Sequence, residues 1–502
     1  MPLTALYRQV QPPSGAHLAL ACSLVPARDD PARELTGHLL CANNNCIHVY
    51  AVTRTHTLVH LASRSLHGRV SSLARVRTLQ SAADAKDRIL VGFTDAKMSL
   101  MEWSQHAHDL VPVSLHTFEK LPQVADDRPS LLAVDPASRL AALLLPTNSG
   151  GDATLALLPF FADDLDLDTI GIDRDAWQGG SIPYAPSHLV PLAALTSSSL
   201  ASTASNAFLP GAAQPPVRNV VSMAFLPGFT EPTLALLYAP EWTWSGRLEH
   251  LAHNYLVSLV TLTTASGAAA ASTRATVIST SPPLPYSCLQ LTACPPHIGG
   301  VVVTTANGLL HVDQSGRVVA CPANAWLARD YPPGRARPPG LDAPPPPPQQ
   351  QPAGVRDALD GARLAWLSHP ADSDSDSDAD ADADADTESA LLDPSTSASA
   401  SAGDATALVV TRSGRALVLS VTLTGRAVSA LHLAPIADLG AVTGAGAGAA
   451  ALVRISGSAG ARDRHGGLVF VGSETGAGAL VRWRWEYDVD DDDAAATVGA
   501  AG

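Results

Sequence analysis

The sequence predicts an all-β protein, and the number of its strands favours a β-propeller over a sandwich or a barrel. Apolar runs of four to six residues recur along most of the 502-residue chain, and turns rich in Gly, Pro, Asp and Ser separate them. Few windows carry the sustained 3.6-residue apolar period of a helix. Sandwiches and barrels rarely use so many strands. No Trp-Asp dipeptide and no regular 40-residue identity occurs, so degenerate blades are expected rather than typical WD40 repeats.

The stretch from Arg88 to Glu119 specifies the strand pattern best. An apolar run over residues 89–93 stops at the polar turn Thr94–Lys97, restarts over residues 98–103, pauses at polar residues and alternates again to Phe118. This order is typical of antiparallel strands in a meander. Nothing in it resembles a nucleophile, a general base or a phosphate-binding loop. The segment therefore indicates a scaffold rather than a catalyst.

Further strand-like runs extend the pattern over both halves of the chain. They cover residues 39–52, 58–61, 111–117, 131–134, 140–145, 154–161, 220–226, 233–238, 255–262, 276–278, 300–304, 309–312, 407–411, 416–422, 468–471 and 479–485.

Composition divides the chain into an entry segment, a propeller and a tail. We expect an N-terminal entry segment at 1–35, a β-propeller at 36–486 and an acidic disordered tail at 487–502. Three segments within the propeller lack strand periodicity: 163–214, 329–352 with its five consecutive prolines, and 371–402 with its Asp-Ser and Asp-Ala repeats. Such segments cannot bury enough apolar area to order themselves, so they are predicted to be disordered loops inserted between strands.

The charge and the cysteines exclude some classes of protein. The net charge is −15, but the run 372–388 contributes −9 and the tail 488–493 contributes −5, so the remainder is nearly neutral. Six cysteines in so long a chain do not form a disulfide framework. The N-terminus lacks the basic start and apolar stretch of a signal peptide, and no run of about 18 apolar residues predicts a membrane span. A reducing compartment, the cytosol or the nucleus, is expected.

Several phrases in this pattern resemble a known family in the same order along the chain. They are QVQPPSG near the start, GFTDAKMSLMEW followed by HDLVPVSLHTFE, LLAVDPASRLAALLL with ALLPF, FLPGFTEPTLALLYAPEWTWSGR, PLPYSCLQLTACPPHIGGVVVTTANGLLHVDQS and GLVFVGSETGAGALVRWRWE. Together they resemble the N-terminal part of the largest subunit of cleavage and polyadenylation specificity factor. The three predicted insertions have no counterpart in the family pattern.

The resemblance implies the first, seven-bladed propeller of a longer scaffold with no catalytic activity. Complete members continue into two more propellers and a helical region, so we expect a fragment, a split gene model or a truncated relative. The implied function is to organise, in the nucleus, the subunits that recognise the polyadenylation signal. The implied partners are a WD-repeat subunit and a zinc-finger subunit, with indirect contact to pre-mRNA. The alternative is a propeller adaptor of the damaged-DNA-binding/ubiquitin-ligase type or of the splicing factor 3b type, since these relatives share the architecture.

Tryptophan and arginine supply the candidate binding residues. Trp242, Trp244 and Arg247 are the candidate partner-binding residues, because Trp is enriched at interface hot spots. Trp483 and Trp485 are weaker candidates for the same role. The alternative for each tryptophan is core packing between blades, the commoner role.

Other patterns offer only weak candidates for metal, cofactor or ligand sites. The three histidines 106, 108 and 116 lack metal-ligand spacing and a completing cysteine, so surface turns are expected. The pairs Cys41/Cys46 and Cys288/Cys294 have no second knuckle and are expected to be buried thiols. The glycine-rich run 444–448 lacks the Lys-Ser/Thr of a phosphate loop. The acidic run 372–386 lacks an EF-hand pattern, and its serines could accept phosphate from an acidophilic kinase. No catalytic residue, cofactor or metal is expected.

Overall fold

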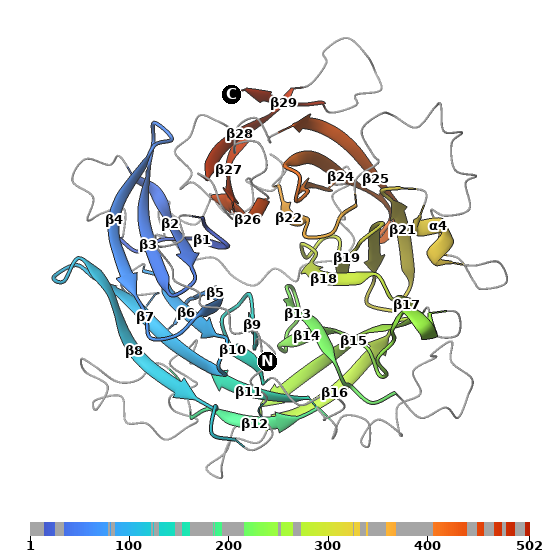
Figure 1. Cartoon of the computed structure of the whole chain (residues 1–502), viewed down its shortest axis with the longest axis horizontal. Coiled ribbons are helices and arrows are strands. Elements are labelled where there is room, and N and C mark those ends of the chain that lie inside the picture. Colours follow the sequence, from blue (N-terminus) through green and yellow to red (C-terminus); the bar gives the residue numbers. More distant parts are fainter. Residues whose placement is uncertain are drawn as a thin grey trace, which may run out of the picture.

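The structure, a computed structural model, describes a β-propeller. The residues described are 15–25, 35–78, 81, 86–121, 124, 130–145, 153–160, 184, 186–192, 215–248, 253–264, 273–324, 326–331, 338–339, 358–367, 405–438, 449–455, 466–473, 478–486 and 497–501. Within them the strands form seven antiparallel sheets, each built from strands consecutive in sequence. Figure 1 shows these sheets as blades around a common centre, which confirms the predicted seven-bladed propeller.

The first four blades contain the strands up to the middle of the chain, each written from the centre outward. Blade 1 is β1 (Leu18–Cys22), β2 (Leu35–Asn43), β3 (Cys46–Thr53) and β4 (Leu58–Ser65). Blade 2 is β5 (Val70–Val76), β6 (Arg88–Phe93), β7 (Lys97–Ser104) and β8 (Asp109–Thr117). Blade 3 is β9 (Leu131–Val134), β10 (Leu140–Leu145), β11 (Thr154–Pro159) and β12 (His188–Pro191). Blade 4 is β13 (Val220–Leu226), β14 (Thr233–Tyr238), β15 (His253–Thr264) and β16 (Thr273–Thr280), with β17 (Leu284–Pro285) also paired to β15.

The last three blades complete the ring. Blade 5 is β18 (Cys288–Ala293), β19 (Val301–Thr305), β20 (Gly308–Val312) and β21 (Val318–Pro322). Blade 6 is β22 (Arg363–Trp366), β23 (Ala405–Val410), β24 (Arg415–Thr424) and β25 (Ala427–Asp438). Blade 7 is β26 (Ala449–Ile455), β27 (Gly466–Ser473), β28 (Ala479–Glu486) and β29 (Thr497–Ala501). The described residues also contain the 3-10 turn η4 (Ser245–Arg247) and the short helix α4 (Leu327–Asp330).

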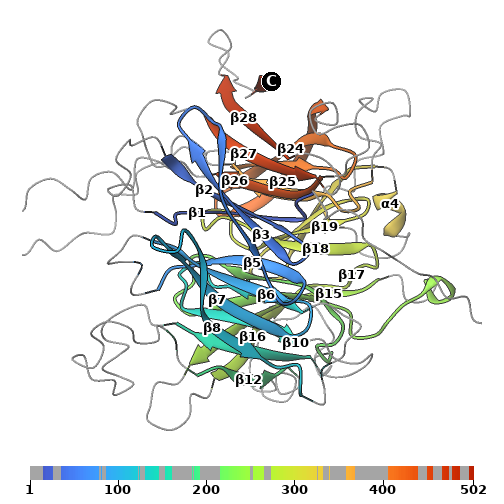
Figure 2. The same ribbon diagram turned by 60° about the vertical axis from the view of Figure 1, so that its left-hand side comes forward.

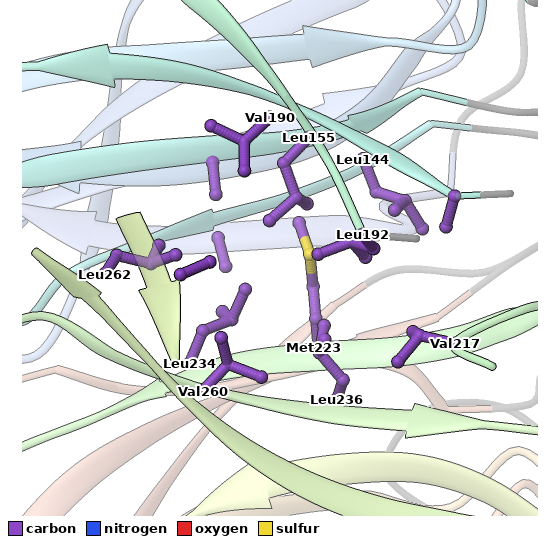
Figure 3. Close-up of a cluster of buried hydrophobic side chains, with 14 of the residues drawn as sticks. Leu144, Leu155, Val190, Leu192, Val217, Met223, Leu234, Leu236, Val260 and Leu262 are labelled. Atoms are coloured by element: carbon purple, nitrogen blue, oxygen red, sulfur yellow. The ribbon is translucent and has the colours of Figure 1, made fainter. Parts of the chain in front are cut away.

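The hydrophobic core lies between blades. Seven apolar clusters each join the side chains of two neighbouring blades. Figure 3 shows one of them, where Leu144 and Leu155 of blade 3 face Met223 and Leu234 of blade 4. A middle strand is therefore buried on both faces, and β6, β10, β14 and β23 are buried at every residue. This explains why these strands read as continuous apolar runs.

Blades 1 and 7 close the ring by packing. Leu39 and Cys41 of blade 1 pack against Leu468 and Phe470 of blade 7. A backbone hydrogen bond from Ala16 N to Ser473 O, 2.9 Å long, joins the entry to β1 with the end of β27. Figure 2 places blade 1 beside blade 7, with β1 and β2 next to β26 and β27.

The structure corrects the strand prediction in two ways. The run 39–52 was predicted as one strand but forms β2 and β3, because Asn44 adopts a left-handed backbone with φ 54° and turns the chain. The prediction also omitted β12, β17, β21, β25 and β29, and it omitted the innermost strands β1, β5, β18, β22 and β26. The innermost strands line the centre of the ring and are largely half-buried, so their sequences alternate weakly, as in the Val70–Val76 strand VSSLARV.

The predicted insertions fall mostly outside the described residues. Segment 371–402, the acidic run 372–386 within it and the glycine-rich run 444–448 lie entirely outside them. Within segment 163–214 the structure places β12, which pairs with β11 as the outermost strand of blade 3. No helix among the described residues is long and apolar enough to cross a bilayer.

Candidate partner-binding surface

The candidate residues lie on the loop between β14 and β15. Strand β14 is fully buried. At its end, the hydroxyl of Tyr238 forms a hydrogen bond of 3.1 Å with the hydroxyl of Ser258. Burial raises the pKa of Tyr238 to about 12, with the Ser258 contact opposing that shift. Pro240 follows two residues later, and its missing N–H cannot continue a ladder. The loop 241–248 therefore starts from the rigid, buried end of β14.

Arg247 organises this loop. Its guanidinium donates to the Glu241 carboxylate at 3.2 Å and to the Trp242 carbonyl at 3.3 Å. The same guanidinium lies over the Trp244 ring, 4.9 Å from its centroid, in a cation–π arrangement. Asn254 holds the loop from β15 by donating to the Glu241 carbonyl at 3.1 Å. The three candidate residues thus form one connected unit.

Both tryptophans of the loop expose their rings. Trp244 is 59% exposed and Trp242 39%. A Cβ at position 246 would lie 3.3 Å from the Trp244 indole nitrogen, so glycine leaves room for the ring over the η4 turn. Trp483, by contrast, is buried between blades 6 and 7, and the side chain of Trp485 lies outside the described part of the chain. The alternative prediction of core packing between blades is thus wrong for Trp242 and Trp244 and is confirmed for Trp483.

Helix α4, in the connection between β21 and β22, packs against the start of β15. His253, at the start of β15, contacts the Asp330 carbonyl through Nε2 and stacks edge-on against Tyr331 with 4.8 Å between ring centroids. The Asp330 carboxylate accepts hydrogen bonds from Ser287 at 3.1 Å and from Asn307 at 3.0 Å. Asp330 therefore joins α4 to two turns of blade 5. Figure 1 shows α4 and β17 on the same side of the ring.

The sequence analysis missed two further exposed aromatic side chains, which lie on other connections of the chain. Trp326 precedes α4 and is 57% exposed, and Tyr286 is exposed next to Ser287. With Trp242 and Trp244 they are all the large aromatic residues found exposed among the described side chains. We call the two exposed tryptophans of the loop 241–248, Trp242 and Trp244, the aromatic surface.

The other candidates are placed without forming a site. His106 and His108 are exposed in the turn before β8, as predicted, whereas His116 is half-buried against Tyr184. Cys41, Cys288 and Cys294 are buried, as predicted, whereas Cys46, which was also predicted to be buried, is only partly buried. Burial raises the pKa of the Cys41 thiol to about 12, which keeps it protonated. Among the described residues no group of three His, Cys, Asp or Glu side chains is arranged to hold a metal ion.

Part of the propeller matches a known protein family. Residues 34–149, from the start of β2 past the end of β10, match the family model of the RSE1/DDB1/CPSF1 first β-propeller. The family resemblance read from the sequence is confirmed.

Fungal relatives match a longer part of the chain. Protein cft1 of Aspergillus niger is 26% identical over 361 residues, which cover 64% of this chain and 23% of the relative. Protein CFT1 of Coccidioides immitis is 30% identical over 54% of this chain and 19% of the relative. Protein cft1 of Neurospora crassa is 30% identical over 52% of this chain and 17% of the relative. The chain thus spans about a fifth of the length of these relatives.

Proposed function

We propose that the chain is a non-catalytic scaffold subunit of the nuclear machinery that cleaves and polyadenylates pre-mRNA. The observation that carries this proposal is the agreement between the match of residues 34–149 to the RSE1/DDB1/CPSF1 first propeller and the similarity to Cft1 proteins. A propeller supplies a rigid support whose function depends on what binds to its loops and faces. Chemistry is then performed by other subunits.

The aromatic surface is the proposed docking site for protein subunits. Large aromatic side chains that are held rigid lose little entropy on binding, and tryptophan dominates interface hot spots. Arg247 holds the Trp244 ring in place, so the loop is pre-organised. Glu241 offsets the charge of Arg247, so the loop offers apolar area without a positive field. This favours a protein partner over direct contact with pre-mRNA. The proposed partners are the WD-repeat and zinc-finger subunits.

A binding experiment with purified subunits tests the proposal. The chain is mixed with the WD-repeat subunit, with the zinc-finger subunit and with both, and affinity is measured by isothermal titration calorimetry. Removing a hot-spot tryptophan costs about 2 kcal/mol or more, so Trp242→Ala and Trp244→Ala should each weaken binding by about 30-fold. Arg247→Ala should weaken binding less, since it frees the Trp244 ring without removing it.

The matched control is Ile278→Ala, which truncates an exposed side chain of β16 outside the aromatic surface. It should bind as the unchanged chain does. No binding to either subunit, together with binding to a cullin scaffold or to a splicing factor 3b subunit, would assign the chain to a sister family. Binding that the two tryptophan variants leave intact would keep the scaffold function and reject the aromatic surface as its site.

A further inference from the structure

Two histidines on the outer half of blade 1 aim ring nitrogens at one point. Nδ1 of His48, on β3, lies 2.8 Å from the hydroxyl oxygen of Ser63, on β4. Nε2 of His60, also on β4, lies 2.8 Å from the same oxygen. The centroids of the two imidazole rings are 6.2 Å apart. His48 is half-buried, whereas His60 and Ser63 are exposed, so the point of convergence is open to solvent.

A β-bulge creates this convergence. His48 lies opposite Ser63 in the ladder of β3 and β4. Tyr50 lies opposite His60, and the register shifts between these two pairs. Side chains alternate along a regular strand, so residues 60 and 63 would otherwise lie on opposite faces of β4. The extra residue of the bulge, Leu61, brings both to the face that carries His48. Bulges redirect side chains in this way and are over-represented next to functional sites.

Tyr50 supports the two imidazole rings from below. The His60 ring meets the Tyr50 ring edge-on, with 5.4 Å between centroids and an angle of 70° between the ring planes. The His48 ring lies 6.5 Å from the same aromatic ring. Tyr50 itself packs against the apolar cluster that joins blades 1 and 7. The imidazoles therefore stand on paired strands and on a side chain held by the core, which limits the freedom they lose when they bind a ligand.

The hydrogen bonds to Ser63 define the state of the two rings. A hydroxyl carries one proton, so it donates to one neutral imidazole and accepts from the N–H of the other. One ring nitrogen thus already directs its lone pair at the shared point, and the other does so after a change of tautomer. A neutral imidazole nitrogen with its lone pair directed in this way is the form that ligates metal ions.

We propose that His48 and His60 bind a divalent transition-metal ion of the Zn²⁺ and Cu²⁺ class on the outer half of blade 1. Imidazole suits Zn²⁺, Cu²⁺ and Ni²⁺, whereas Ca²⁺ and Mg²⁺ take oxygen ligands. Metal–nitrogen distances are about 2.0–2.1 Å, shorter than the hydrogen bonds to Ser63, so the ion takes the place of the hydroxyl and this exposed side chain rotates aside.

Two protein ligands leave the ion partly open. No group of three potential ligands occurs among the described residues, so water completes the coordination of the ion. The ion joins β3 to β4 next to the seam between blades 1 and 7. The site is independent of the proposed role in polyadenylation, because it uses neither tryptophan of the aromatic surface.

The test uses the purified full chain without a histidine tag and CuCl₂ as the probe, because Cu²⁺ is the divalent ion of this series that such ligands bind most tightly. Electron paramagnetic resonance at substoichiometric Cu²⁺ should show nitrogen ligation, and spin-echo modulation should count two imidazoles. His48→Ala and His60→Ala should each leave one imidazole. Loss of a group that merely orients a ligand already costs about 10-fold in affinity, so each variant should weaken binding by at least that factor. Circular dichroism checks that both variants keep their sheet content.

Three comparisons make the assignment specific. His67→Ala, in the exposed turn after β4, is the matched control and should change neither the count nor the affinity. Ser63→Ala should bind Cu²⁺ at least as tightly as the unchanged chain, because its hydroxyl competes for the two nitrogens. Excess ZnCl₂ should displace Cu²⁺, and MgCl₂ should not.

Four results would overturn the proposal. They are a count below two in the unchanged chain, unchanged affinity in the double variant His48→Ala/His60→Ala, loss of binding in Ser63→Ala, and failure of ZnCl₂ to displace Cu²⁺.

Discussion

The ion pair of Asp135 and Arg139 supports a quantitative prediction about how neighbouring blades are held together. The Asp135 side chain is fully buried and accepts from Arg139 Nε at 2.7 Å and from Arg139 Nη2 at 2.9 Å. The third nitrogen of the guanidinium, Nη1, donates to the Thr230 carbonyl in the following blade. This pair therefore ties the turn between β9 and β10 to blade 4.

Asp135→Ala removes the buried carboxylate and leaves the guanidinium without its partner. Breaking a buried ion pair costs 3–5 kcal/mol, and Arg139 keeps 26% of its side chain in water, so we expect the lower end, about 3 kcal/mol. Asp313→Ala is the matched control. Asp313 holds a similar turn in blade 5, but the bonds from Ser315 and Arg317 that it accepts are exposed. It should cost about 1 kcal/mol.

Urea unfolding followed by circular dichroism measures both variants, with equal slopes required for the comparison. A double-mutant cycle with Arg139→Ala should give a coupling energy of about 1–2 kcal/mol between the two residues. If Asp135→Ala costs no more than Asp313→Ala, or if the cycle shows no coupling, the pair does not hold the blades as described.

Three further predictions concern the interior. Burial raises the pKa of Tyr238 to about 12, above its ordinary value near 10. The stability contributed by the protonated, buried Tyr238 is thus complete below pH 10 and is lost as the pH rises to 12. Ultraviolet titration of the folded chain, compared with that of Tyr238→Phe, will show the raised pKa. Gly300→Ala should lower the free energy of unfolding by more than about 2 kcal/mol, because φ is +73° and a Cβ would lie 2.3 Å from the Val312 carbonyl oxygen. Gly425→Ala, at φ +66° but with open space around the Cβ, should lower it by about 1 kcal/mol in the same urea assay. Of the six thiols only Cys46 is not buried, so a thiol reagent should modify one cysteine quickly in the native chain and the rest only on denaturation; fast reaction of a second thiol would contradict the buried positions.

The sequence predicted the fully buried middle strands well, although it missed the buried outer strand β21. Strand β10, with six consecutive buried residues, reads as an apolar run because another blade covers each of its faces. The innermost β5 carries two serines and an arginine and is only partly buried, so no periodic signal distinguishes it. The number of blades came from the resemblance, since the missed strands made counting impossible.

The candidate site was predictable in part. The phrase EWTWSGR gave Trp242, Trp244 and Arg247, but their exposure depends on how Arg247 folds the loop around Trp244. No sequence pattern indicated the exposure of Trp326, which precedes α4, or the hydrogen bonds by which Asp330 holds α4 to blade 5.

The organisation of the ring has a consequence for protein engineering. Because every blade is made of strands consecutive in sequence, each ladder of backbone hydrogen bonds is complete within one stretch of chain. New termini placed at any junction between blades would therefore cut no ladder, and a linker joining the present ends would only reinforce the seam of blades 1 and 7. Circular permutation at successive junctions would then compare the seven seams one by one and rank how strongly each pair of blades adheres.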